Sequence, residues 1–184
     1  NQAALVNGVL SLEVKDNFDE AVVITARDAR GKSGSSALVT LSSRSGDYRS
    51  IGSGDWGDGA SWQGWDGSDW VAAALPPNGA AGVDITIQAG HTLTLSSALS
   101  LLGTLTVNGS LSFSGGGALA VGGGAILRNA GVVGSSTASL SFGAGASYEH
   151  NFTSSPGTIP SAAWGIGSSC AVIGFTDSTS TPGG

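Results

Sequence analysis

The chain has 184 residues, 31 of them glycine, with only 11% charged residues and a formal net charge of −6. Helix-favouring Glu and Lys are scarce, whereas Gly, Ser, Thr, Ala and Val dominate, which predicts short strands joined by tight turns. Beyond residue 50 the sole basic residue is Arg128, which excludes a nucleic-acid-binding surface and disfavours an anionic membrane surface. No apolar run reaches the roughly 18 residues of a transmembrane helix. We therefore expect an all-β protein without membrane insertion.

Residues 1–45 are predicted to form three strands, Ala4–Val14, Ala21–Ala26 and Ala37–Leu41, separated by polar turns. Apolar and polar residues alternate along the first strand, and clusters of Asp, Asn, Gly and Lys interrupt the pattern, as in strand–turn–strand units. The sequence "LSLEVKDNFDEAVVITARDARGKSGSSALVTL" resembles the C-terminal half of a bacterial immunoglobulin-like domain. This resemblance implies a sheet that lacks part of its sandwich, because a complete domain has about seven strands.

The missing strands leave three alternatives for this segment: a domain cut short, packing against the rest of the chain, or strands supplied by another chain. In the last case the chain would associate with copies of itself, as a homo-oligomer or filament. The candidate self-association residues all lie in the first predicted strand and are Leu5, Val9, Leu10, Leu12 and Val14.

Residues 46–82 form an irregular segment, a linker or a cap, in which four of the five tryptophans lie among aspartates. Tryptophan rings stack on sugars, so the candidate carbohydrate-binding residues are Trp56, Trp62, Trp65 and Trp70. The alternative is that they cap the open end of a solenoid, which would otherwise expose apolar core and strand edges. The nearby aspartates do not have the spacing of an EF-hand, and Asp-Gly pairs more often mark turns. We expect no cofactor, with calcium at these aspartates as the minor alternative.

Residues 83–184 are predicted to form a β-solenoid. Segments such as "GTLTVNG", "GSLSFSG" and "GALAVGG" repeat an apolar–small–apolar triplet every six to eight residues, as expected for the faces of a β-helix. A β-sandwich is the alternative, although its turns are usually 8–12 residues apart. The predicted strands are Val83–Ile87, Thr92–Leu95, Leu105–Val107, Leu111–Phe113, Leu119–Val121, Ala125–Leu127 and Leu140–Phe142.

Five elements in order between residues 53 and 127 are similar to the G8-type region of secreted and cell-surface proteins, many of them large bacterial ones. They are an Asp-Trp followed by a second Trp, a Pro-containing turn, "VDITI", "GHTLTL" and "LTVNGSL". The resemblance implies an extracellular β-helix that serves as a scaffold, adhesive or ligand-binding part of a larger protein. It implies no catalysis by this region.

The sequence offers no defensible catalytic set, since His91 and His150 are far apart and serine is too abundant to identify a triad. The lone Cys170 is expected to be a small buried hydrophobe. Two functions remain. The chain is a non-catalytic structural or adhesive module of a bacterial surface protein or filament, or it is a carbohydrate-binding module of a larger secreted enzyme. Absence of any Met suggests a piece of a longer polypeptide.

Overall fold

A computed structural model describes residues 46–153 and 155–174, together with the backbone of four short strands before them. The chain divides into two compact units, Asn1–Ser43 and Arg44–Gly184. Apart from one 3-10 turn, η1 (Gly59–Ser61), every regular element in the described part is a strand, which confirms the all-β class. Within that part, no helix is long and apolar enough to span a membrane.

The N-terminal unit contains two antiparallel strand pairs. Strand β1 (Glu20–Val22) pairs with β4 (Val39–Leu41), and β2 (Thr25–Arg27) pairs with β3 (Ser33–Ser35). The single strand predicted at 21–26 is therefore divided between β1 and β2, and part of the predicted turn forms β3. The predicted strand Ala4–Val14, with all five candidate self-association residues, lies outside the described residues.

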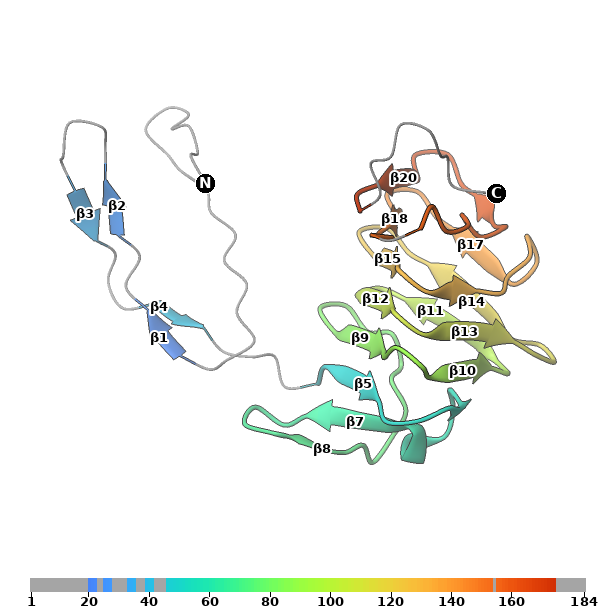
Figure 1. Cartoon of the computed structure of the whole chain (residues 1–184), viewed down its shortest axis with the longest axis horizontal. Helices are drawn as coiled ribbons and strands as arrows, with labels where there is room; N and C mark the ends of the chain where they lie inside the picture. The colour runs from blue at the N-terminus through green and yellow to red at the C-terminus, as the bar shows by residue number, and fades with distance from the viewer. Residues whose placement is uncertain are drawn as a thin grey trace. The chain divides into compact units, whose positions relative to one another are not determined.

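The larger unit is a parallel β-solenoid with three faces, which confirms the solenoid and excludes a sandwich for these residues (Figure 1). The first sheet contains β5 (Tyr48–Ser50), β9 (Asp84–Ile87), β12 (Thr104–Val107), β15 (Ile126–Asn129), β18 (Ser147–His150) and β20 (Ser169–Val172). The second contains β6 (Gly54–Asp55), β10 (Thr92–Leu95), β13 (Ser110–Phe113) and β16 (Val132–Val133). The third contains β11 (Ala98–Leu101), β14 (Ala118–Val121), β17 (Leu140–Phe142) and β19 (Ala163–Trp164).

The coils stack in constant register. Asp84, Thr104, Ile126, Ser147 and Ser169 occupy equivalent positions in the first sheet, so successive coils differ by 20 to 22 residues. Because side chains alternate along a strand, every second residue points into the solenoid. Two inward columns of the first sheet result: Ile85, Leu105, Leu127, Tyr148, Cys170, and Ile87, Val107, Asn129, His150, Val172.

Glycine allows the turns of adjacent coils to approach each other. A Cβ atom at Gly103 would lie only 2.1 Å from the carbonyl oxygen of Val83 in the preceding coil. Gly124, by contrast, has a φ of 80°, a left-handed conformation that costs glycine little. The corner glycines seen in the sequence therefore serve close packing as well as unusual backbone angles.

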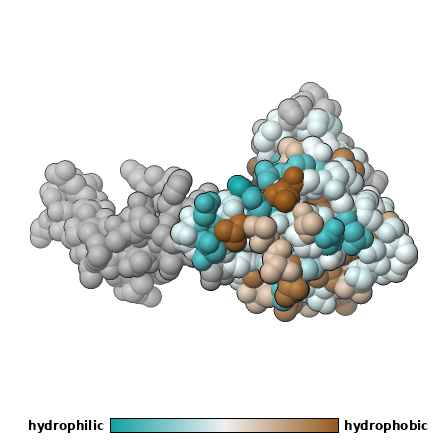
Figure 2. Space-filling view, turned by 90° about the horizontal axis from the view of Figure 1, so that it is seen from below, coloured by the Kyte–Doolittle hydropathy of each residue, from teal (hydrophilic) through white to brown (hydrophobic). Residues whose placement is uncertain are grey.

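A cap closes the solenoid at its N-terminal end. Strands β7 (Trp62–Trp65) and β8 (Trp70–Ala72) form an antiparallel hairpin that joins the first sheet through β5. Trp56 and Trp62 are buried, with ring centroids 4.8 Å apart, and their Nε1 groups donate to the carbonyl oxygens of Pro77 and Trp56. From below, the capped end shows a mostly pale surface with separate hydrophobic spots (Figure 2).

This burial corrects the sequence-based expectation for two of the four tryptophans. The indole faces of Trp56 and Trp62 contact protein on all sides, so neither ring can stack on a sugar while the cap is folded. These two rings instead act as a cap that closes the apolar interior of the first coil.

Candidate functional site: a groove beside the cap

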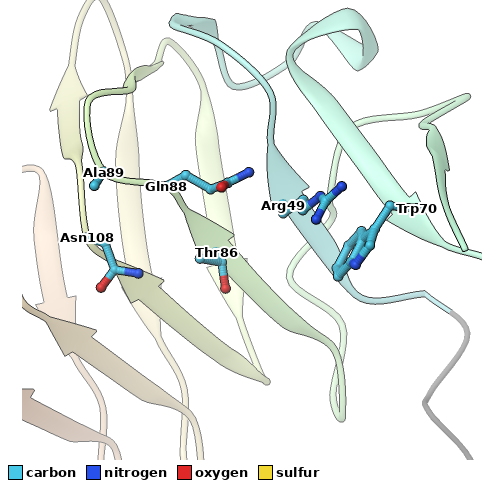
Figure 3. Close-up of a pocket in the computed structure, with 6 residues that line it drawn as sticks. All are labelled: Arg49, Trp70, Thr86, Gln88, Ala89 and Asn108. Carbon is cyan, nitrogen blue, oxygen red and sulfur yellow. The ribbon is translucent and has the colours of Figure 1, made fainter. Parts of the chain in front are cut away.

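An open groove of about 370 Å³ lies on the outer face of the first sheet, where the cap meets the first two full coils (Figure 3). It is lined by one cation, one aromatic ring, an alanine and three uncharged polar side chains: Arg49, Trp70, Ala89, Thr86, Gln88 and Asn108. None of these lining residues is acidic.

Strand register brings these residues together from positions far apart in the sequence. Arg49 of β5 is paired with Thr86 of β9, and Gln63 of β7 is paired with Arg49 on its other side. Gln88 follows β9 directly, and Asn108 follows β12 in the next coil. Trp70 begins β8, the outer strand of the cap. Parallel stacking of β5, β9 and β12, together with the antiparallel hairpin of the cap, therefore builds the groove.

Arg49 is held by the aromatic hairpin. Its Nε donates to Gln63 Oε1 at 2.9 Å, and its guanidinium carbon lies 4.6 Å from the centroid of the Trp70 ring. That separation is typical of a cation–π contact. Trp65 meets Trp70 edge to face at 5.4 Å, which stabilises the ring that supports the cation.

Gln88 is fixed by a buried serine. Ser50 Oγ accepts a hydrogen bond from the Gln88 N–H at 2.9 Å, and Gln88 Nε2 donates to the Ser50 carbonyl oxygen at 2.7 Å. Ser50 Oγ also lies within hydrogen-bonding distance of His91 Nδ1, 2.8 Å away. Ser50 is completely buried, so this serine–histidine pair ties the cap to the first coil and has no route for nucleophilic attack.

The aspartates of the cap form turns. The side chains of Asp55 and Asp58 accept N–H groups two residues further along the chain. Asp66 accepts from the backbone of Ser68 and Asp69, and these hydrogen bonds, that of Asp69 first, hold the pKa of its carboxyl below the usual range. Among the described residues, no group of three potential ligands gathers around a metal position. These carboxylates act as turn-forming side chains.

A second polar cluster lies inside the solenoid near its other end. Asn129 Nδ2 donates to the Tyr148 hydroxyl at 3.1 Å, and that hydroxyl lies 3.0 Å from His150 Nδ1. His150 Nε2 lies 2.6 Å from the Pro156 carbonyl oxygen, which can only accept, so Nε2 carries the proton and Nδ1 accepts from Tyr148. Burial raises the pKa of Tyr148 to about 12. Among the described residues, every buried side-chain nitrogen and oxygen has a hydrogen-bond partner, and the bonds of His150 give it a structural role.

Sequence reasoning found part of this site. Of the four candidate tryptophans, Trp70 lines the groove and Trp65 contacts the Trp70 ring. Arg49 and Gln88 were missed, because each resembles an ordinary polar residue at a strand end. The alternation "DYRS" before the tryptophan segment was the available signal, since it places Asp47 and Arg49 on one face of a strand. Cys170, expected to be buried, is exposed, although partial desolvation raises the pKa of its thiol.

Comparison with protein-family models, with curated proteins and with solved structures gives no match for this chain.

Proposed function

We propose that the chain is a non-catalytic structural and adhesive module of a bacterial extracellular surface protein, and that it associates through the exposed end of its solenoid. The observation that carries this proposal is the exposure of inward positions in the last described coil. Cys170 and Val172 occupy the columns that are buried in every preceding coil, yet Val172 is 48% exposed.

The same end presents further apolar surface. Trp164 extends the column of Phe142, with rings stacked at 4.3 Å, and remains 41% exposed, while Ile166 is 98% exposed. Strand β20 is the last strand of the first sheet in the described part. An edge strand beside exposed apolar side chains is a template for pairing with another β-element. Solenoid coils gain stability from each neighbour, so another coil-like element stacked here would bury this surface.

The N-terminal unit supplies the second half of the proposal. Its resemblance to part of an immunoglobulin-like domain suggests strand donation by Leu5, Val9, Leu10, Leu12 and Val14, all outside the described residues. The G8-type resemblance supports an extracellular location. Both features agree with a module that works inside a larger assembly.

Sedimentation velocity and negative-stain electron microscopy over a range of concentrations test this function. We expect oligomers or filaments from the full chain. Deletion of residues 1–16 tests strand donation, and Val172→Lys tests stacking at the solenoid end. Whichever variant yields monomers identifies the surface used; a wild-type chain that stays monomeric at every concentration contradicts self-association.

The groove favours a second function, carbohydrate binding. Trp70 gives an aromatic wall, and Thr86, Gln88 and Asn108 offer hydroxyl and amide groups that can hydrogen-bond to sugar hydroxyls. A polysaccharide panel with the Trp70→Ala variant tests this function. Val71→Ala, at an exposed position on the same strand, is the matched control. Loss of binding in Trp70→Ala alone supports the site, and absence of binding to every polysaccharide contradicts it.

A further inference from the structure

We propose that the groove beside the cap selects acidic sugars, with a ligand carboxylate bound by Arg49. This inference rests on the proposed carbohydrate-binding function and names the ligand class of that site. It depends on the state of the Arg49 side chain, on what covers the Trp70 ring and on the charges around the groove.

The guanidinium group of Arg49 is oriented but not neutralised. Its Nε is used by Gln63, and it makes neither an ion pair nor a further hydrogen bond in the part of the chain that the structure describes. The two Nη groups are therefore available as donors. A planar guanidinium whose position is already fixed binds a carboxylate through two parallel hydrogen bonds at a small entropic cost.

Arg128 on the same outer face provides a contrast. The register places Arg49, Thr86, Thr106 and Arg128 in one column across the first sheet. Arg128 Nε lies 2.6 Å from Glu149 Oε2, so its charge is paired. The two arginines are three strands apart, roughly 14 Å at the usual strand spacing. Arg49 is thus the cation in this column that is open to a ligand.

The position of Arg49 also limits how Trp70 can act. The guanidinium lies over the indole ring at 4.6 Å from its centroid, and Trp65 meets the ring at a 63° interplanar angle. A sugar cannot stack on the face that Arg49 covers. Figure 3 shows the two side chains together on one side of the groove, with Gln88, Thr86 and Asn108 across from them. The Trp70 ring therefore packs against the Arg49 guanidinium, which is the group that would contact the sugar.

The carboxylates beside the groove restrict the orientation of an acidic ligand. Asp47 and Asp84 lie two residues before Arg49 and Thr86, and the Asp84 N–H donates to Asp47 Oδ1 at 2.8 Å. Asp69 precedes Trp70, and its Oδ1 accepts from the Trp70 N–H at 2.8 Å. On the other side, Gln88 Oε1 and the Asn108 amide make no hydrogen bond within the described residues. A sugar ring can therefore place its carboxylate at the Arg49 guanidinium and its hydroxyls at Gln88 and Asn108.

The test compares polysaccharides that differ only in charge. Titration calorimetry would use polygalacturonate and alginate, each beside its fully methyl-esterified form, together with neutral xylan, cellulose and starch. We expect an acidic polymer to bind at least about tenfold more tightly than its ester, because a charge-assisted bidentate contact is lost on esterification. Binding should also weaken as salt is raised, because the attraction is screened.

Variants assign the effect to one residue. Arg49→Gln should weaken binding of the acid about tenfold or more and bring it to the level of the ester. Arg128→Gln removes the same charge from the same column and should leave affinity within about twofold. If Arg49→Gln does not fold, Arg49→Lys can replace it, because lysine keeps the charge but lacks the planar guanidinium. In that case the affinities of the wild-type chain for the acid and for its ester still test whether the groove selects a carboxylate.

Two negative outcomes have different meanings. Equal binding of acid and ester, or of neutral polymers alone, with loss in Trp70→Ala, overturns the acidic-sugar inference and leaves carbohydrate binding standing. Absence of binding to every polymer, acidic or neutral, overturns both.

Discussion

The two ends of the solenoid differ in how far their apolar interior is covered. At the N-terminal end, an antiparallel hairpin and two buried tryptophans cover the first coil, and Trp62 is fully enclosed. At the other described end, the inward columns finish in Cys170 and Val172, which are exposed. A solenoid strand is stabilised mainly by its neighbours, so a coil whose inward side chains are exposed has less stabilising contact than the coil beneath the cap.

This difference shows that the same apolar triplet can be buried in one coil and exposed in another. The apolar triplet is the same in the first and last coils, but burial depends on what is stacked above it. The cap encloses the apolar interior of the first coil, and the groove lies beside it. The last described coil leaves inward positions exposed, and we propose that these positions contact another β-element.

Trp62→Ala should cause the largest loss of stability. Removing a fully buried indole leaves a large cavity in the cap, and such changes cost about 3–5 kcal/mol. Urea unfolding followed by circular dichroism measures the loss. Trp65→Ala, at a half-buried position on the same strand, should cost much less. Equal costs at the two positions would contradict the assignment of Trp62 to the core.

Alkaline pH should selectively weaken the coils around Tyr148. Its pKa is about 12 in the folded chain because the hydroxyl is buried, against about 10 when unfolded. The unfolded state therefore loses its proton first, and stability present below pH 10 is lost as the pH rises through 12. The loss should reach up to about 3 kcal/mol. Unfolding free energies measured from pH 9 to 12 provide the test, with Tyr148→Phe as the variant that should lack this component.

Ser50→Ala should loosen the junction between the cap and the first coil. The substitution leaves the Gln88 N–H and His91 Nδ1 without their partner, at a cost of about 1–2 kcal/mol. Ser53→Ala is the matched control, because Ser53 Oγ also accepts a backbone N–H, that of Thr92, but is exposed. Thermal denaturation of both variants should show the larger shift for Ser50→Ala, and the reverse order would contradict the proposed junction.

Val172→Lys should have the smallest effect on the isolated chain. At an exposed site a substitution usually changes stability by less than about 0.5 kcal/mol. The same change at Val107, the buried equivalent three coils earlier in the register, should prevent folding. Thermal melts of the two variants compare the ends directly. A large destabilisation by Val172→Lys would show that its column is covered within the chain.

Local signals determined much of this protein. Apolar–small–apolar triplets at short intervals, separated by glycine, predicted seven of the nine strands between residues 83 and 142 to within about two residues, and with them the β-helix; β11 and β16 were not predicted. Because side chains alternate along a strand, the inward residues could also be assigned. The clustering of tryptophans indicated either a cap or a binding surface, and both alternatives prove relevant to this segment.

The sequence could not show the strand β11, whose "ALSL" follows β10 after only two serines, or which tryptophans would be buried. It also could not place Arg49 over Trp70 or reveal the exposed end of the last described coil. These features depend on the pairing of strands about 20 residues or more apart, and on the cap that folds back over the first coil. A periodic pattern specifies the strand and its inward face, but the neighbour that covers each face, and the groove left between neighbours, is decided only when the coils stack.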